Sequence, residues 1–416
     1  MKSAAFLGIL FLAAGAQAQH HHDGMAESPA LSLLHSQSAG TAQDPASAPM
    51  SMTMFSLGRW SLMLHGVAFF NNVDQTGPRG RDNQFSTNWV MASATRQIGA
   101  GALMLRGMFT VEPYTIDQRQ YPLLFQTGET AFGRPIIDGQ HPHDLFMELA
   151  AEYARPLGRG VGYVYVAPVG DPALGPVAFP HRSSASEIPQ AVLGHHFEDS
   201  THIASSVVTG GYRLGQFTLE ASAFHGGEPD ENRTNIEIGR IDSGSARLTW
   251  APTSHLVAQV SAGMLHKPEA LEPRNAKRRT ASVSYDVPLG AMHSTSTLVW
   301  GQVYKESHRS TLDAYLAESL LHVSNRNWVS VRAERAEKDE LFPHFHPPNR
   351  PDFAPAVPTF TINSLLVGYT FDVITHRAIR VGVGANFTKY SLPKPLFLFY
   401  GEHPTTQVVY VRLRLQ

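Results

Sequence analysis

The chain has 416 residues, a formal net charge of −2 with neutral histidine, 21 histidines and no cysteine. The absence of cysteine excludes disulfides, thiolate metal sites and a lipidated N-terminal cysteine. A charge so close to neutral argues against nucleic acid as a partner.

The N-terminus has the features of a secretory signal. Met1-Lys2-Ser3 is followed by residues 4–16 without a polar side chain, and then by the small-x-small site Ala16-Gln17-Ala18. This pattern predicts a signal peptide over residues 1–18, removed after Ala18. The alternative, a short buried helix, fits poorly because polar, His-rich sequence follows at once. No later stretch approaches the roughly 20 apolar residues of a membrane helix.

Residues 19–54 lack periodicity and are rich in Ser, Ala, Gln, His and Met, so we expect a flexible periplasmic segment. After cleavage, a free amine two residues before a histidine can bind Cu(II) or Ni(II) in a square plane, and alternating thioethers can share Cu(I). Alternatively, the methionines simply enter the first strand. The candidate copper ligands of this segment are His20, His21, His22, Met50, Met52 and Met54.

From about residue 60 to the end, apolar and polar residues alternate in stretches of roughly ten. In the last stretch Val409, Val411 and Leu413 share one face, opposite Arg412 and Arg414. Such stretches occur in pairs around short turns, the signal of a β-hairpin. The pairs are residues 85–98 with 102–112, 145–155 with 161–168, 203–213 with 217–225, 244–251 with 256–265, 280–287 with 293–304, 312–323 with 328–337, and 362–373 with 378–390.

Longer polar connections separate these pairs, so short and long connections alternate along the chain. With a first strand near residues 60–70 and a last at 407–416, about sixteen strands result. The predicted fold is all-β: a transmembrane antiparallel up-and-down barrel over residues 55–416, with short periplasmic turns and long extracellular loops. A soluble sandwich, the alternative, gives no reason for this regularity. The expected partners are outer-membrane lipid and the barrel-insertion machinery, although the ending Leu415-Gln416 lacks the usual terminal aromatic residue.

Charges stay off the centre of each apolar face, where Lys or Arg would cost about 2–4 kcal/mol in lipid. The weakest strand is 312–323, because Glu318 shares parity with Leu316 and Leu320; we expect a bulge or a kink in register there. About sixteen strands enclose an aqueous lumen. The predicted lumen-lining residues carry both signs and indicate no strong ion preference: Arg106, Glu148, Glu152, Glu220, Arg247, Arg332, Glu334, Arg380, Arg412 and Arg414.

Two long loops concentrate imidazoles and carboxylates, ligands that suit Zn, Cu or Ni. Because His196, Asp199 and His202 are spaced by three, a helical turn would bring them together. The alternative is a hydrogen-bonded loop packed over the barrel mouth. Asp199, Ser200 and His202 also permit a rim hydrolase, although no Gly-x-Ser-x-Gly elbow occurs. The candidate loop ligands are His141, His143, Asp144, His195, His196, Asp199 and His202.

The segment QHPHDLFMEL at 140–149 resembles an uncharacterised family of bacterial outer-membrane proteins, as do LLFQTGET at 123–130, DSTHI at 199–203 and EPD at 228–230. The similarity spans nearly the whole mature chain and implies a barrel in the outer membrane of a Gram-negative bacterium, without an activity. The His/Met-rich leader is similar to that of copper-resistance outer-membrane proteins. We therefore expect a porin-like channel for small solutes and no enzyme; the alternative is a protein that binds or exports copper or another divalent metal.

Overall fold

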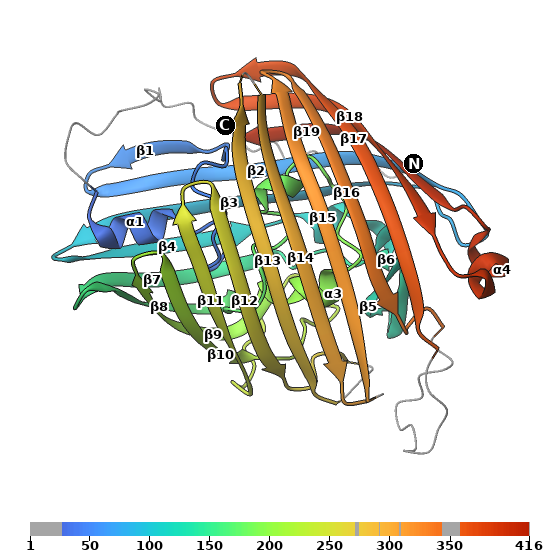
Figure 1. Ribbon diagram of the computed structural model, residues 1–416, viewed down its shortest axis with the longest axis horizontal. Coiled ribbons are helices and arrows are strands. Elements are labelled where there is room, and N and C mark those ends of the chain that lie inside the picture. The colour runs from blue at the N-terminus through green and yellow to red at the C-terminus, as the bar shows by residue number, and fades with distance from the viewer. Residues whose placement is uncertain (1–26, 271–273, 291, 308, 343–357, 416) are drawn as a thin grey trace.

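The computed structural model describes residues 27–270, 274–290, 292–307, 309–342 and 358–415, and one large antiparallel sheet dominates it (Figure 1). The sheet has 17 strands, of which β1 is a short hairpin partner of β2; the other sixteen close into a barrel where β19 pairs with β2. The predicted all-β barrel of about sixteen strands is thus confirmed. The strands are β1 (Thr53–Leu57), β2 (Trp60–Gln75), β3 (Asn83–Ile98), β4 (Gly101–Phe109), β7 (Phe146–Leu157), β8 (Gly160–Gly170), β9 (Ala204–Leu214), β10 (Phe217–His225), β11 (Ser243–Thr253), β12 (Leu256–Leu265), β13 (Ala276–Leu289), β14 (Met292–Lys305), β15 (Ser310–Ser324), β16 (Asn327–Lys338), β17 (Phe360–His376), β18 (Ile379–Ser391) and β19 (Thr405–Leu415).

The alternation in sequence becomes an outer and an inner face. On β19, Val409 is 57% exposed and Val411 43%, whereas Arg412 is fully buried. A strand places successive side chains on opposite faces, so the apolar row faces outward and the charged row inward. The inner side chains are buried because other parts of the chain fill the barrel.

Strand β15 corrects one expectation. Its register with β14 is continuous from Ser310 to His322, so the bulge or kink in register predicted near Glu318 is absent from this pairing. Leu316, Glu318 and Leu320 all face inward and are buried. The two leucines do not need lipid, because Leu316 packs in an internal cluster with residues of an inward-folded loop.

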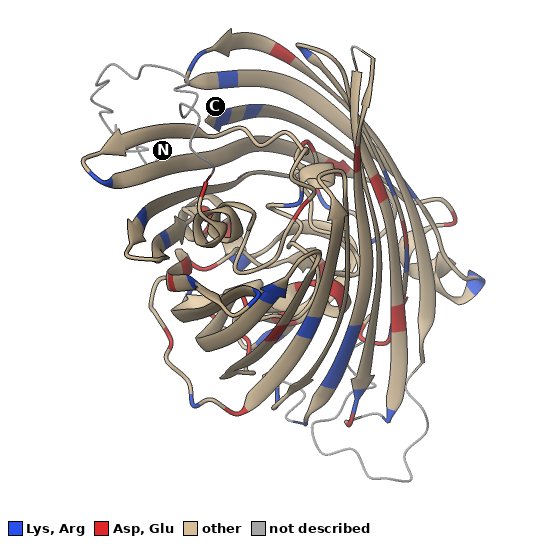
Figure 2. Cartoon of the chain, turned by 60° about the vertical axis from the view of Figure 1, so that its left-hand side comes forward, with Lys and Arg blue, Asp and Glu red and all other residues tan. Residues whose placement is uncertain are grey.

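The first part of that internal filling is the N-terminal segment. Residues 27–52 were expected to be flexible, but they are folded inside the barrel (Figure 2). Helix α1 (Pro29–His35) begins after Ser28, whose hydroxyl accepts from Leu31 N at 3.4 Å. Leu33 and Leu34 are buried in one cluster with inward residues of β4, β7 and β8. The expectation was therefore wrong for residues 27–52, because the barrel interior offers this helix an apolar surface.

The second part is the inner loop, residues 171–203, which connects β8 to β9. It carries η2 (Ser183–Ala185), α3 (His195–Glu198) and η3 (Ser200–Ile203), and most of it is buried. The connection from β4 to β7, predicted as a plain loop, contains α2 (Glu112–Thr115), η1 (Asp117–Arg119) and the hairpin of β5 (Tyr121–Ala131) with β6 (Arg134–Gln140). Near β19 lie η5 (Lys394–Leu396) and α4 (Phe397–Tyr400). None of the described helices is long and apolar enough to cross a membrane.

Candidate functional site in the lumen

Most charges of the inner wall hold the internal segments in place. Arg106 donates from Nε and Nη2 to Glu148 at 2.8 and 2.9 Å, and also donates to the carbonyl of Gly40. Arg247 pairs with Glu220 at 2.8 and 3.0 Å and donates to Thr41 Oγ1 at 2.8 Å. Bidentate pairs leave further guanidinium N–H groups free for a third partner. These arginines therefore connect the wall to the N-terminal segment.

The remaining predicted lumen residues also lie on the inner side. Arg332 donates to the carbonyl of Gln190 at 3.0 Å, and Glu334 accepts from Leu193 N at 2.6 Å. The charged side chains of the wall thus also bind the inner loop, and they do not line an open pore. Contacts of the other predicted lumen residues are Glu152 with Gln37, Arg380 with Asp372, Arg412 with Asp372 and Glu187, and Arg414 with Glu187.

The structure brings together the five histidines that the sequence singled out in the loops. Ring centroids are 5.3 Å apart for His143 and His202, 5.3 Å for His195 and His202, and 5.2 Å for His195 and His196. His141 is 6.3 Å from His196. This imidazole cluster lies where the loop ending in His143 meets α3 and η3.

Four of these rings have an acceptor beside Nδ1, which for His141 is the carbonyl of Pro142 at 3.0 Å; the other three are His143, His195 and His202. Glu112 Oε2 lies 2.8 Å from His143 Nδ1, Asp199 Oδ1 lies 2.7 Å from His195 Nδ1, and the Asp199 carbonyl lies 2.8 Å from His202 Nδ1. Because all three partners are acceptors, Nδ1 carries the hydrogen and Nε2 is the other functional nitrogen. Within the described residues, Nε2 of His143 and of His202 is buried without a hydrogen-bond partner.

His141 and His196 also face carboxylates. His141 Nε2 lies 2.8 Å from Glu129, and His196 Nδ1 lies 3.3 Å from Glu228. The predicted trio of His196, Asp199 and His202 does not form as expected: α3 ends at Glu198, and Asp199 contacts His195 instead of His196. The predicted ligand Asp144 lies 3.5 Å from Arg233.

The cluster is not a ready metal centre. Across the described ranges, no three His, Asp or Glu side chains are grouped so that they could hold a metal ion as they stand. Burial lowers the pKa of His195 to about 4 and lowers the pKa of His202 well below its ordinary value. Burial also opposes protonation of His143, but Glu112 beside it raises that pKa above the ordinary value. The neutral rings keep a nitrogen lone pair available near neutral pH.

The hydrolase alternative gains no support from the geometry. Ser200 Oγ accepts from Arg278 at 2.9 Å, and His202 Nδ1 faces the carbonyl of Asp199. A nucleophilic serine needs a histidine base that is itself oriented by the acid, and these contacts do not provide that relay.

The leader residues are only partly placed. His20, His21 and His22 lie outside the described residues. Met50 lines an internal cavity, Met52 is half-buried, and Met54 is 49% exposed on β1. The three methionines are therefore not gathered at the imidazole cluster.

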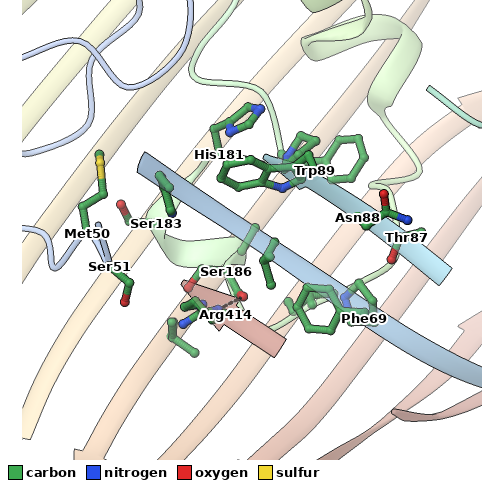
Figure 3. Close-up of a pocket in the computed structure, with 18 of the residues that line it drawn as sticks. Met50, Ser51, Phe69, Thr87, Asn88, Trp89, His181, Ser183, Ser186 and Arg414 are labelled. Atoms are coloured by element: carbon green, nitrogen blue, oxygen red, sulfur yellow. Dashed lines mark hydrogen bonds between the residues drawn. The ribbon is translucent and has the colours of Figure 1, made fainter. Parts of the chain in front are cut away.

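That cavity, of about 90 Å³, lies between the wall and the inner loop (Figure 3). His181 from the inner loop and Trp89 from β3 both line it and pack edge to face against each other, with ring centroids 4.2 Å apart. Sequence reasoning missed His65, His293 and His322, which also line the cavity. The alternation along the strands places these three histidines on the inner face of the wall, and this was the signal in the sequence that could have identified them.

The architecture defines the fold class, a closed antiparallel β-barrel of sixteen strands like that of outer-membrane porins. No protein-family model matches the chain, and neither does any curated protein. Among solved structures, the anion-selective porin from Comamonas acidovorans aligns with a TM-score of 0.52 at 11% identity, over 85% of this chain and 99% of that one. OmpF of Salmonella typhi, in complex with daunomycin, gives 0.54 at 8% identity over 87% and 100%, and Pseudomonas putida OprB gives 0.52 at 11% over 86% and 94%. Similarity at this identity establishes the fold alone.

Proposed function

We propose that the protein is a channel for small solutes in the outer membrane of a Gram-negative bacterium, with residues 1–18 as its signal peptide and residues 19–26 as part of its leader. The closed wall with an apolar outer face supports the membrane location. The observation that carries the channel is the closed wall of sixteen strands, since a barrel of this strand number encloses a lumen wide enough for water and small solutes.

The internal segments make this channel narrow. The N-terminal segment and the inner loop occupy the lumen and use its charges for cross-links such as Arg106 to Gly40 and Arg332 to Gln190. Charges of both signs are paired on the wall, as in Arg247 with Glu220. We therefore expect low conductance and little discrimination between K⁺ and Cl⁻.

Planar-bilayer recording tests this proposal. The full mature chain should give small single-channel steps, and a variant lacking residues 28–48 should give steps several times larger. The control is a chain in which the same residues are kept but released by protease cleavage, which should match the deletion. Absence of conductance from both the refolded full chain and the deletion would end the proposal.

A further inference from the structure

Four histidines that line the internal cavity have a buried ring nitrogen without a hydrogen-bond partner in the described part of the chain: His65, His143, His181 and His322. At the end near the short turns lies His322; its neighbour across β14 and β15 is His293, whose Nε2 is paired with Asp286. His65 and His181 both pack edge to face against Trp89, with ring centroids 4.7 and 4.2 Å from it. His143 lines the same cavity and belongs to the imidazole cluster.

These nitrogens lack protein partners. In the described structure, His181 is 8% exposed and neither of its ring nitrogens has a hydrogen-bond partner. The same is true of His65 Nδ1, His322 Nε2 and His143 Nε2, all of which are buried atoms. A buried polar atom without a partner costs about 1–3 kcal/mol, so several around one cavity point to something bound there.

Imidazole nitrogen is a preferred ligand for zinc, copper and nickel ions. Metal-binding histidines commonly donate their other ring N–H to a carboxylate or a carbonyl, and His143, His195 and His202 do so here. Two imidazoles on one tetrahedral ion, at about 2.0–2.1 Å per bond, have centroids about 5 Å apart. The 5.3 Å separations of His143 from His202 and of His202 from His195 are close to that spacing.

We propose that the cavity and the imidazole cluster form a row of weak sites for a transition-metal ion, which identifies the solute class of the channel and so rests on the proposed function. No three ligands are gathered at one point in the described chain, so each site offers one or two imidazoles. Weak successive sites suit passage, because an ion must bind well enough to enter and loosely enough to leave.

The test uses Zn(II) as the probe and the full mature chain in detergent. The double variant His181→Phe with His322→Phe removes three free nitrogens and keeps both aromatic contacts, since His322 stacks on Trp328 at 3.7 Å. Replacing an unsatisfied polar group by an apolar one of similar shape is close to neutral for folding. His403→Phe, in an exposed position, is the matched control.

Equilibrium dialysis should show Zn(II) bound by the wild type and by the control, and at least a twofold smaller amount bound by the double variant. Mg(II) should bind none of them. The leader histidines His20–His22 add the same amount to every protein, so the Zn(II) bound by a peptide of residues 19–26 is subtracted before the twofold comparison. Equal Zn(II) binding by all three proteins would overturn the proposal.

Zn(II) uptake into vesicles containing each protein gives the second readout. Uptake should fall at least fivefold in the double variant, while K⁺ conductance stays as in the wild type. Unchanged Zn(II) uptake would refute the proposal that the metal ion passes along these histidines, without contradicting the proposed channel for small solutes. The dialysis experiment needs no membrane, so it tests the metal sites independently of the channel. If the barrel conducts nothing, the proposed channel is refuted, and the dialysis result alone decides whether the metal sites exist.

Discussion

Arg182 Nε lies 2.6 Å from Glu318 Oε1, and both side chains are fully buried. This pair joins the inner loop to β15. Glu318 also accepts from Arg332 of β16 at 2.9 Å and from Ser184 Oγ at 2.8 Å. A charged residue can therefore stand between two inward leucines, because the loop supplies its counter-charge.

Replacing Glu318 by leucine should destabilise the barrel strongly. Arg182 would keep only the more distant Asp199, at 3.4 Å, as a carboxylate partner. Breaking a buried ion pair by removing one partner costs about 3–5 kcal/mol. Urea unfolding of refolded protein in vesicles measures the change, with the exposed Glu402→Leu as a control expected within about 0.5 kcal/mol of wild type. Equal midpoints for the two variants would show that the pair contributes little.

Gly40→Ala should release the N-terminal segment from the lumen. Gly40 has φ +50°, and an added Cβ would lie 2.5 Å from Asp171 Cβ, so the substitution is both strained and blocked. Gly58→Ala is the matched control, because Gly58 has φ +60° with nothing within 4 Å of an added Cβ. We expect faster protease cleavage within residues 36–48 and larger bilayer conductance for Gly40→Ala alone. An equal increase in both variants would assign the effect to backbone strain, and wild-type cleavage and conductance in Gly40→Ala would contradict the prediction.

Sequence periodicity was sufficient for the wall and insufficient for the interior. The alternation of Val409 and Val411 with Arg412 depends only on the period of a strand and on the difference between its apolar outer face and its polar inner face, so it was predictable. Leu316 was misread because a period of two cannot tell lipid from an apolar loop. Leu33 and Leu34 were missed because a seven-residue helix gives too short a pattern to stand out from a polar segment.

The sequence predicted which histidines form the imidazole cluster, but it did not predict which side chains they contact. Histidine density located His143, His195 and His202 in two loops, but their convergence depends on how residues 171–203 fold back into the barrel. The spacing favoured His196 as the partner of Asp199, whereas the helix ends at Glu198 and leaves His195 in contact. Local spacing carries no information on where a short helix stops.

If the outer face of the barrel contacts lipid, an arginine placed on it should destabilise the protein more at the middle of a strand than at its end. Leu298 is 59% exposed at the middle of β14, and Leu289 is 46% exposed at the end of β13 beside a short turn. Leu298→Arg should lower the free energy of unfolding in vesicles by about 2–4 kcal/mol, and Leu289→Arg by about 0–1 kcal/mol. Folding titrations in lipid measure both. Similar small costs at both positions would contradict a membrane-spanning wall.

Docking of the N-terminal segment should strengthen as pH falls, through Asp44. Its carboxylate accepts from Ser183 N at 2.9 Å and from Ser183 Oγ at 2.7 Å, which ties the segment to the inner loop. Burial raises the pKa of Asp44 above its ordinary value, against the effect of these hydrogen bonds. The docked segment therefore holds its proton more tightly than a released one, and this contribution is lost as pH rises through the raised pKa.

Asp44→Asn keeps an acceptor for Ser183 and removes the titration. Between pH 7 and pH 4, protease resistance of residues 36–48 should increase more in the wild type than in Asp44→Asn. Asp117→Asn, an exposed position in η1, should retain the wild-type response. Other buried carboxylates titrate in all three proteins, so only the difference between variants reports on Asp44. An identical pH response in wild type and Asp44→Asn would show that this carboxyl does not control docking.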